Sequence, residues 1–348
     1  KMTDPPLFAV AGSLLQAVKK NKHIQWVQDV YPDLFPLVGG KFPKVVTKVM
    51  AHLSQRSMQK ADKVIVIGRC MARRLAHAGL PPKHIAVVPN WPDPELRLDD
   101  IDDSADADFK VNEEIESIIA QSGRAENYRT HNEQVKSGPK FRVLYAGNIG
   151  KIHPVGSILN AARILQNQHP EIEFLFVGDG PKYDAIMRAK AQEHMDNVKL
   201  LPYQPPSRLR ALMESGDVHV VSLDERAVGM AVPSKLYSAI ASNRPCVLIG
   251  AADSEAAKVV TDYKIGQVIG QGKAEMLADI IKGYRLDGDA WFAAHENSKK
   301  AAAVFLPEAS MNAFIERAWQ VLGGRADEVK NARDQESQKQ EAQDMAAE

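Results

Sequence analysis

The sequence predicts an α/β protein built on doubly wound parallel sheets, and three observations support this prediction. Short runs rich in Val, Ile and Leu alternate with longer amphipathic stretches, as parallel strands alternate with crossover helices. The short runs lack strict alternation of apolar and polar residues, which is typical of strands covered by helices on both faces. At 348 residues the chain is long enough for about two domains.

Composition and charge narrow the class of protein. A chain with 45% hydrophobic and 25% charged residues is typical of a soluble globular protein. The 44 basic residues balance the 44 acidic ones, so no overall charge favours nucleic acid as a partner. Cys70 and Cys246 lie far apart in apolar segments, which fits a reducing cytosol. The sequence has neither an apolar run of the ~20 residues that span a membrane nor the zones of a signal peptide.

Residues 1–93 form the first predicted domain. Its predicted strands and helices are the strands 24–27, 63–67 and 85–88 and the helices 42–60 and 69–78. Prolines punctuate its end. The chain then turns polar and acidic over residues 94–140, which predicts a linker or insertion with one candidate helix at 113–120. We interpret its aspartates as solvated linker charge and expect no metal site there.

Residues 141–306 form the second predicted domain, which repeats the alternation of strands and helices. Its predicted strands are 141–145, 173–177, 198–200, 218–222, 246–249 and 266–269. A last helix is predicted at 314–322, within a segment 307–324 that ends at Gly323 and Gly324. The charged tail 325–348 contains few large apolar residues, so we expect it to be only partly helical or disordered.

Three segments follow predicted strands, where an open parallel sheet binds its ligands. In the first, Gly147, Asn148, Gly150 and Lys151 form a glycine-rich turn before a predicted helix, and its free amides and lysine would suit a phosphate. Turns of this kind are also common structural devices, so both interpretations stay open.

The second segment, 178–181, reads Gly-Asp-Gly-Pro, and its proline fits a first helical turn. A structural role is favoured here, because the segment does not match a dinucleotide-binding fingerprint. In the third segment, Val232, Pro233 and Ser234 lead into a helix that has Lys235 in its first turn. A cation there is unfavourable unless an anion is present, so Lys235 is either a phosphate ligand or a solvated lysine.

Five motifs occur in a characteristic order. They are ADKVIVIGRCM at 61–71, VPNW at 88–91, YAGNIGK at 145–151, VGDGP at 177–181 and VPSKLY at 232–237. In this order they resemble the retaining group 1 glycosyltransferases of GT-B architecture that serve bacterial polysaccharide assembly. The resemblance covers residues 3–322 apart from the acidic linker. It implies two Rossmann-like domains with a cleft between them, a nucleotide-sugar site in the second domain, and a final helix that packs back on the first.

The resemblance also implies roles for single residues. Gly150 and Lys151 match positions that face the donor diphosphate, and Lys235 matches a second cation on the phosphate side. Val232, Pro233 and Ser234 would offer backbone contacts. Asp29 falls near the place where many relatives put a histidine facing the sugar, although it could equally cap the turn after its strand. Asp29, Lys151 and Lys235 are therefore the candidate catalytic residues.

Two departures from the family pattern matter. Many relatives carry two glutamates where this chain has Met230 and Ser238, and Glu255 could substitute for the ribose-binding glutamate or could simply serve the helix dipole. Only about ninety residues precede the hinge, so the resemblance leads us to expect a truncated acceptor domain. A nucleotide-sugar epimerase or hydrolase, or a non-catalytic nucleotide-binding assembly subunit, are the alternative functions.

The expected ligands follow from the family. They are a UDP- or GDP-linked sugar donor and a saccharide or lipid-linked acceptor, with no cofactor, no metal and no nucleic acid. The stretch 42–60 carries Val45, Val49 and Leu53 beside Lys44 and Lys48, so a cytoplasmic protein that associates peripherally with an anionic membrane is also expected. For the helix as a whole we favour burial of the apolar side in the first domain, while its lysines could still face lipid.

Overall fold

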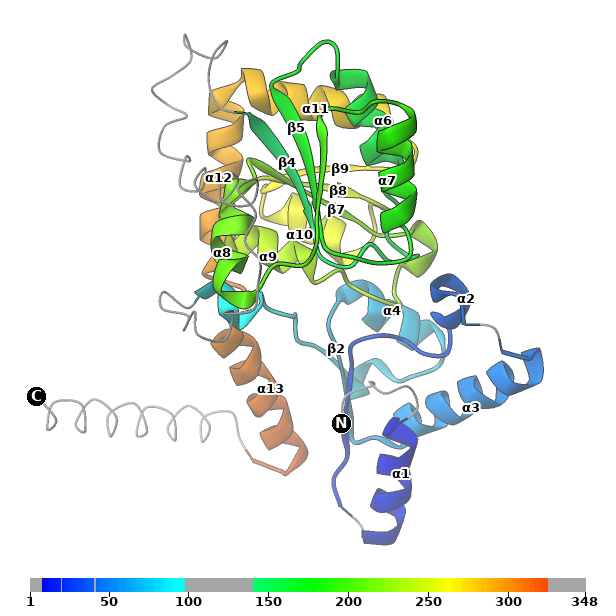
Figure 1. Cartoon of the computed structure of the whole chain (residues 1–348). Coiled ribbons are helices and arrows are strands. Elements are labelled where there is room, and N and C mark those ends of the chain that lie inside the picture. Colours follow the sequence, from blue (N-terminus) through cyan, green and yellow to red (C-terminus); the bar gives the residue numbers. More distant parts are fainter. Residues whose placement is uncertain (1–7, 20, 41, 98–139, 325–348) are drawn as a thin grey trace, which may run out of the picture. The chain divides into compact units, whose positions relative to one another are not determined.

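The computed structural model describes residues 8–19, 21–40, 42–97 and 140–324, and it divides the chain into two units (Figure 1). Unit 1 comprises Lys1–Asp33, Phe42–Pro89 and Glu308–Glu348. Unit 2 comprises Leu34–Lys41 and Asn90–Pro307. Among the described residues, no helix has both the length and the apolar character that crossing a membrane requires.

Unit 1 is built on a parallel sheet with the strand order β1-β2-β3. Its strands are β1 (Ile24–Val27), β2 (Lys63–Val66) and β3 (Ile85–Val87), and its helices are α1 (Phe8–Lys19), α3 (Lys44–Lys60), α4 (Arg69–His77) and α13 (Pro307–Val321). The ring of Trp26 on β1 stacks on that of Phe314 on α13, with centroids 5.0 Å apart. The last helix of the described residues therefore packs on the first strand of this sheet.

One side of α3 is apolar and exposed. Val45 is 73% exposed and Val49 53%, and Leu53 is exposed as well. The burial of this side that the sequence analysis favoured is therefore wrong for the first three turns of the helix. The buried residues of α3, Ser57 and Met58, lie in its last turn, where Ser57 bonds to Ser13 of α1.

Unit 2 contains a parallel sheet of six strands in the order β6-β5-β4-β7-β8-β9. The strands are β4 (Phe141–Ala146), β5 (Ile172–Val177), β6 (Val198–Leu201), β7 (Val218–Ser222), β8 (Cys246–Ile249) and β9 (Gly266–Ile269). Its helices are α2 (Phe35–Val38), α6 (Gly156–Leu165), α7 (Tyr183–Gln192), α8 (Pro206–Ser215), α9 (Lys235–Ala241), α10 (Glu255–Asp262), α11 (Ala274–Leu286) and α12 (Gly288–Ala302). The predicted doubly wound α/β architecture is confirmed.

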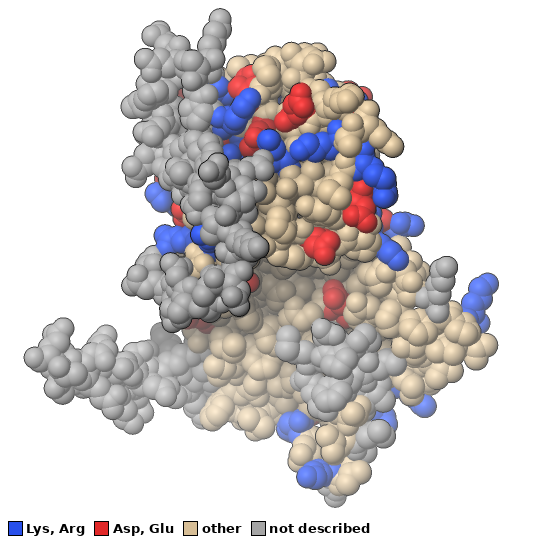
Figure 2. Space-filling view, viewed as in Figure 1, with Lys and Arg blue, Asp and Glu red and all other residues tan. Residues whose placement is uncertain are grey.

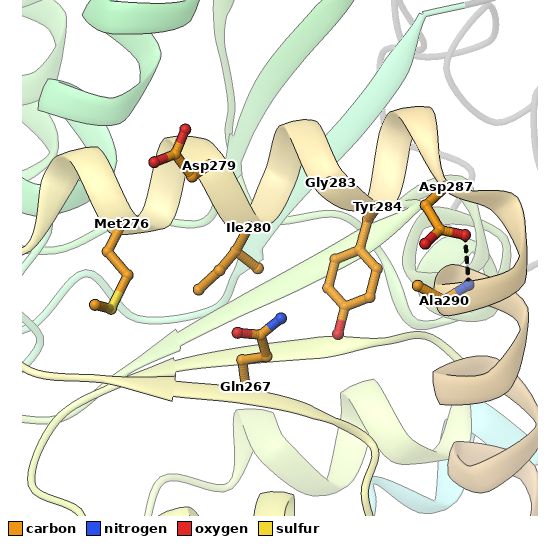
Figure 3. A pocket seen from close by; sticks show the side chains of 8 residues that line it. All are labelled: Gln267, Met276, Asp279, Ile280, Gly283, Tyr284, Asp287 and Ala290. Atoms are coloured by element: carbon orange, nitrogen blue, oxygen red, sulfur yellow. Dashed lines mark hydrogen bonds between the residues drawn. The ribbon is translucent and has the colours of Figure 1, made fainter.

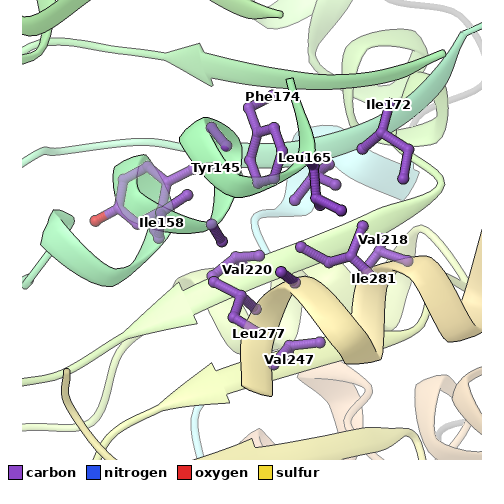
Figure 4. Packing of buried hydrophobic residues seen from close by; sticks show 14 of the residues in the cluster. Tyr145, Ile158, Leu165, Ile172, Phe174, Val218, Val220, Val247, Leu277 and Ile281 are labelled. Carbon is purple, nitrogen blue, oxygen red and sulfur yellow. The ribbon is translucent and has the colours of Figure 1, made fainter. Parts of the chain in front are cut away.

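The sheet of unit 2 buries apolar side chains on both faces, as its unbroken apolar strands predict. On one face Phe174, Val218 and Val220 pack with Leu277 and Ile281 of α11 (Figure 4). On the other face a smaller cluster joins Leu144, Leu175 and Leu212 to Leu96. Full burial of one such side chain stabilises the fold by about 1.5–3 kcal/mol. Leu96 belongs to the short 3₁₀ turn Pro94–Arg97, so the first residues of the predicted linker are docked on this core.

Three helix starts in particular differ from the predictions. The helix expected directly after Lys151 begins only at Gly156, because the His153 amide closes a turn onto the Gly150 carbonyl and Pro154 restricts the residue before it. Helix α7 begins at Tyr183, so Pro181 lies in the turn before it. Helix α13 starts at Pro307 instead of 314, since proline fits a first helical turn. The helix expected at 113–120 and the tail 325–348 lie outside the described residues.

The loops after β4 and β5 approach each other closely at Gly178. A Cβ atom on Gly178 would lie 2.4 Å from the Gly147 carbonyl oxygen, and the Gly178 φ of +131° disfavours any other residue. The structural role favoured for this segment therefore has a geometric basis.

We predict that Gly178→Ala lowers the free energy of unfolding by about 2–4 kcal/mol, because it combines backbone strain with steric overlap. Gly283→Ala is the matched control. Gly283 lies inside α11 with open space around its Cα, so alanine there should stabilise by roughly 0.5–1 kcal/mol. Urea unfolding of both variants measures the difference, and equal stabilities would contradict this account of the loop.

Candidate functional site

The order of strands in unit 2 creates a switch point between β4 and β7. From β4 the chain proceeds outward to β5 and β6, then returns to pair β7 against the other side of β4, with Val143 opposite Val218. In an open parallel sheet, ligands bind outside the carboxyl ends of the strands at such a switch point. The candidate site is the set of loops at this place, which we call the crevice.

Neighbouring loops hold the segment after β4 in place. The Lys182 ammonium donates hydrogen bonds to the carbonyls of Lys151, at 3.0 Å, and His153, at 2.9 Å. The Asp224 amide donates to the Ile152 carbonyl at 2.8 Å. Because these bonds come from the loops after β5 and β7, they set the position of the β4 loop relative to both neighbours.

Lys235 is the first residue of α9, and its side chain reaches across to the β4 loop. Its ammonium donates to the Asn148 carbonyl at 2.9 Å and stands 5.5 Å from the centroid of the Tyr145 ring. A Cβ atom on Gly147 would lie 3.2 Å from Lys235 Cε, so glycine leaves room for the lysine. Desolvation lowers the pKa of Lys235 to about 8. The structure thus places a half-buried cation at the crevice.

The His153 imidazole is neutral and lies near the ammonium groups of Lys235 and Lys182. Its Nδ1 lies 2.6 Å from the Ser222 carbonyl oxygen, and since a carbonyl can only accept, Nδ1 carries the proton. Burial and then the positive charges of Lys235 and Lys182 lower the pKa of His153 to about 4, against the opposing effect of the Ser222 bond. The imidazole therefore ties the β4 loop to β7 without adding a third charge.

The β4 loop also presents donors to the crevice. Within the described part of the chain, the backbone amides of Gly150 and Lys151 make no hydrogen bond, although they follow each other directly. Successive free amides of this kind form concave anion sites. The Lys151 side chain is exposed, and its ammonium lies beside Gly39 of the segment after α2, which also belongs to unit 2. Amides and a buried lysine in one crevice suit a phosphate or diphosphate.

The other predicted site residues differ in burial, and some lie away from the β4 loop. Val232 and Pro233 are buried and Ser234 is exposed, directly before Lys235. Glu255 lies one strand further along, buried in the first turn of α10, whose N-cap is the Ser254 hydroxyl. Asp29 is half-buried in unit 1, after β1. The structure brings Gly147, Asn148, Gly150 and Lys235 together, and the roles of all the predicted site residues stay predictions.

Two residues of the site were not among the predicted ones. His153 and Lys182 lie beyond the glycine-rich motifs that drew attention to their loops, and neither has a distinctive sequence context. The available signal was topological, because His153 follows β4 and Lys182 follows β5, the strands nearest the switch point. Predicting that His153 and Lys182 belong to the site required the order of the strands in the sheet, and the alternation of strands and helices alone does not give this order.

Other features of unit 2 fit an anionic ligand less well. A groove of ≈ 460 Å³ runs along α11 beside the edge strand β9, and its charged side chains are Asp279 and Asp287 (Figure 3). Two carboxylates would repel a diphosphate.

Among the residues that the structure describes, no three His, Cys, Asp or Glu side chains gather as a metal site would require. Basic and acidic side chains are interspersed over the face of unit 2 seen in Figure 2.

A known family model matches the domain that carries this crevice. Residues 140–284 match the family model of glycosyl transferases group 1. A probable glycosyltransferase of Pseudomonas aeruginosa, WbjE, is 22% identical over 265 residues, which are 76% of this chain. The chain spans 60% of the length of that relative.

Solved structures share the fold. HepE of Anabaena, solved in complex with UDP, superimposes with a TM-score of 0.64 at 16% identity, over 90% of this chain and 76% of HepE. WaaG, a glycosyltransferase involved in lipopolysaccharide biosynthesis, superimposes with a TM-score of 0.58 at 15% identity, over 90% of this chain and 81% of WaaG. These glycosyltransferase neighbours confirm the GT-B fold expected from the sequence motifs.

The lowered pKa of Lys235 predicts that diphosphate binding weakens as the pH rises. In the free protein Lys235 is mostly protonated at about pH 7 and mostly neutral at about pH 9, and an anion binds the protonated form. The affinity for UDP, measured by calorimetry, should therefore fall about ten-fold over this range. Lys235→Arg keeps its charge throughout, so its affinity should stay level. A parallel fall in both proteins would contradict this assignment.

Proposed function

We propose that this chain, a group 1 glycosyltransferase of the GT-B fold, moves a sugar from a UDP- or GDP-linked donor to a saccharide or lipid-linked acceptor, with retention of anomeric configuration. The setting would be the synthesis of a cell-surface polysaccharide. The observation that carries the proposal is the crevice between β4 and β7, where the Lys235 ammonium lies beside the free amides of Gly150 and Lys151. HepE, which has this fold, has been solved with UDP and with UDP-glucose.

The donor diphosphate would lie over the β4 loop. Gly147, Asn148 and Gly150 let the phosphates approach the backbone closely, and Lys235 neutralises them from the start of α9. Val232, Pro233 and Ser234 would add backbone contacts at the same place. Lys151, which is exposed, can swing toward the outer phosphate. The pKa of Lys235 would rise when the anion binds, because an opposite charge favours the protonated amine.

The main electrostatic task of the reaction is to stabilise the leaving group. When the glycosidic bond breaks, negative charge develops on the departing nucleoside diphosphate. Lys235 and the loop amides would be directed at that charge, because hydrogen bonds from neighbouring loops hold the β4 loop in place, and the exposed Lys151 would join them by moving toward the phosphate. They would stabilise it without a metal ion, and no cofactor is required for sugar transfer.

Two residues would complete the site. We assign Asp29, after β1 in unit 1, to the sugar side, in the role that many relatives give to a histidine. We assign Glu255 to the ribose, in the absence of glutamates at Met230 and Ser238. Glu255 is buried at 6% exposure, and a carboxylate held in the first turn of a helix can accept two hydroxyl bonds. We place the protein in the cytoplasm, in peripheral contact with a membrane that supplies a lipid-linked acceptor.

Removal of the phosphate-side lysines should weaken donor binding. Lys235→Ala and Lys151→Ala should each cost about 1.5–3 kcal/mol in nucleoside-diphosphate affinity, the range for hydrogen bonds to charged groups. Lys190→Ala, at the end of α7, is the matched control and should bind as the natural protein does. Thermal shift with UDP and GDP measures affinity and identifies the base. Unchanged affinity in both site variants would refute the assignment.

Transfer itself should persist without divalent ions. Incubation with nucleotide-sugar donors and a panel of saccharide and lipid-linked acceptors should yield the elongated acceptor, and a chelator should leave its rate unchanged. Strict restoration of activity by manganese or magnesium would contradict the role given to the lysines. Release of free sugar, or of an epimeric donor, would instead favour a hydrolase or an epimerase.

A further inference from the structure

The His153 imidazole has no role in the proposed diphosphate site, although it lies beside that site. The Cδ2 atom of its ring is 3.4 Å from the place that a Cβ atom on Gly150 would occupy. Cδ2 is bonded to Nε2, so this edge of the ring lies next to the stretch whose free amides are assigned to the diphosphate. A ligand that lies on those amides therefore comes within reach of the His153 ring.

A hydrogen bond on the other side of the ring fixes the tautomer of His153. Nδ1 donates to the Ser222 carbonyl at 2.6 Å, so in the neutral ring Nε2 carries no proton and can only accept. Within the part of the chain that the structure describes, Nε2 has no hydrogen-bond partner. The ring thus offers one acceptor at the border of an anion site.

A phosphate oxygen is the wrong partner for this acceptor. Such an oxygen has lone pairs and negative charge, so it could bind only a protonated ring. Burial and the charges of Lys235 and Lys182 lower the pKa of His153 to about 4, so about one ring in a thousand is protonated at neutral pH. The neutral ring therefore requires a partner that carries a proton.

A nucleotide sugar carries such a group next to its diphosphate. The second phosphate is bonded to the anomeric carbon, whose neighbours in the sugar are the ring oxygen and the carbon C2. The ring oxygen can only accept a hydrogen bond. The substituent on C2, a hydroxyl or an acetamido N–H, is the nearest sugar group that can donate one.

We propose that His153 is a specificity-determining residue for the donor, and that its Nε2 accepts a hydrogen bond from the C2 hydroxyl or acetamido N–H of the transferred sugar. The assignment rests on the proposed function, because it requires the diphosphate to lie on the amides of Gly150 and Lys151. It goes further in naming the class of sugar, which is a 2-hydroxy or 2-acetamido sugar and not a 2-deoxy sugar.

Calorimetry with UDP, UDP-glucose and UDP-2-deoxyglucose tests this role, with the corresponding GDP compounds if GDP is the preferred nucleotide. The natural protein should bind UDP-glucose about three- to ten-fold more tightly than UDP-2-deoxyglucose, which is the usual effect of one hydrogen bond. This ratio is the decisive quantity, because the two compounds share every group except the C2 hydroxyl.

Two variants separate the sugar contact from the bond to Ser222. His153→Asn keeps a donor in the place of Nδ1 and has no atom at the position of Nε2, whereas His153→Gln supplies an amide oxygen near that position. The preference for UDP-glucose over the 2-deoxy compound should disappear in His153→Asn and persist in His153→Gln. The affinity of His153→Asn for UDP alone should equal that of the natural protein.

Three results would overturn the proposal. A preference that survives in His153→Asn would mean that another residue contacts the C2 group. An equal loss of UDP and UDP-glucose affinity in both variants would limit His153 to holding the β4 loop. A rise in UDP-glucose affinity between about pH 7 and about pH 5, absent from His153→Asn, would show that a protonated ring binds a phosphate instead.

Failure of this proposal differs from failure of the proposed function. If the natural protein binds neither UDP nor GDP, the donor site itself is refuted, and the role of His153 falls with it. If UDP binds and the two sugars are not distinguished, the donor site stands and only the role of His153 is lost.

Discussion

Hydrogen bonds from two neighbouring loops hold the segment after β4, and the crevice of unit 2 depends on them. Lys182, from the loop after β5, bonds the carbonyls of Lys151 and His153, while the Asp224 amide bonds that of Ile152. Gly178 permits the close approach because it has no side chain. The carbonyls of the segment accept these bonds, while the amides of Gly150 and Lys151 have no partner among the described residues, as the proposed anion site requires.

Buried charged side chains are paired at one end of the unit 2 sheet and not at the other. At the amino end of β4, the buried Arg142 pairs with Glu173, and Asp217 accepts from the Arg142 amide while the Trp291 indole bonds the Asp217 carbonyl. At the carboxyl end, Lys235 bonds a carbonyl, and no carboxylate of the described residues pairs with it. A cation that lacks a carboxylate partner is what the proposed anion site requires.

The sequence predicted the positions of the strands well, and predicted less well the loops and the exposure of side chains. The segments that became β7, β8 and β9 have the predicted bounds. Short runs rich in Val, Leu and Ile that follow a predicted helix favour a strand of a parallel sheet. The start of α6 was missed although Pro154, which restricts the residue before it, could be read from the sequence. The bond from the His153 ring to the Ser222 carbonyl, 69 residues away in the chain, could not. The exposure of Val45 was missed for a related reason. Periodicity shows that a helix has an apolar side but not whether anything covers it.

The path of the chain has a consequence for synthesis on the ribosome. The chain passes between the units after Asp33, Lys41, Pro89 and Pro307, so neither unit is one continuous segment. Trp26 cannot stack on Phe314 until α13 has emerged, and by then all of unit 2 has been made. Domains usually fold in the order of their synthesis. Here the three strands of the unit 1 sheet are made early, and the helix that packs on its first strand follows only after every residue of unit 2.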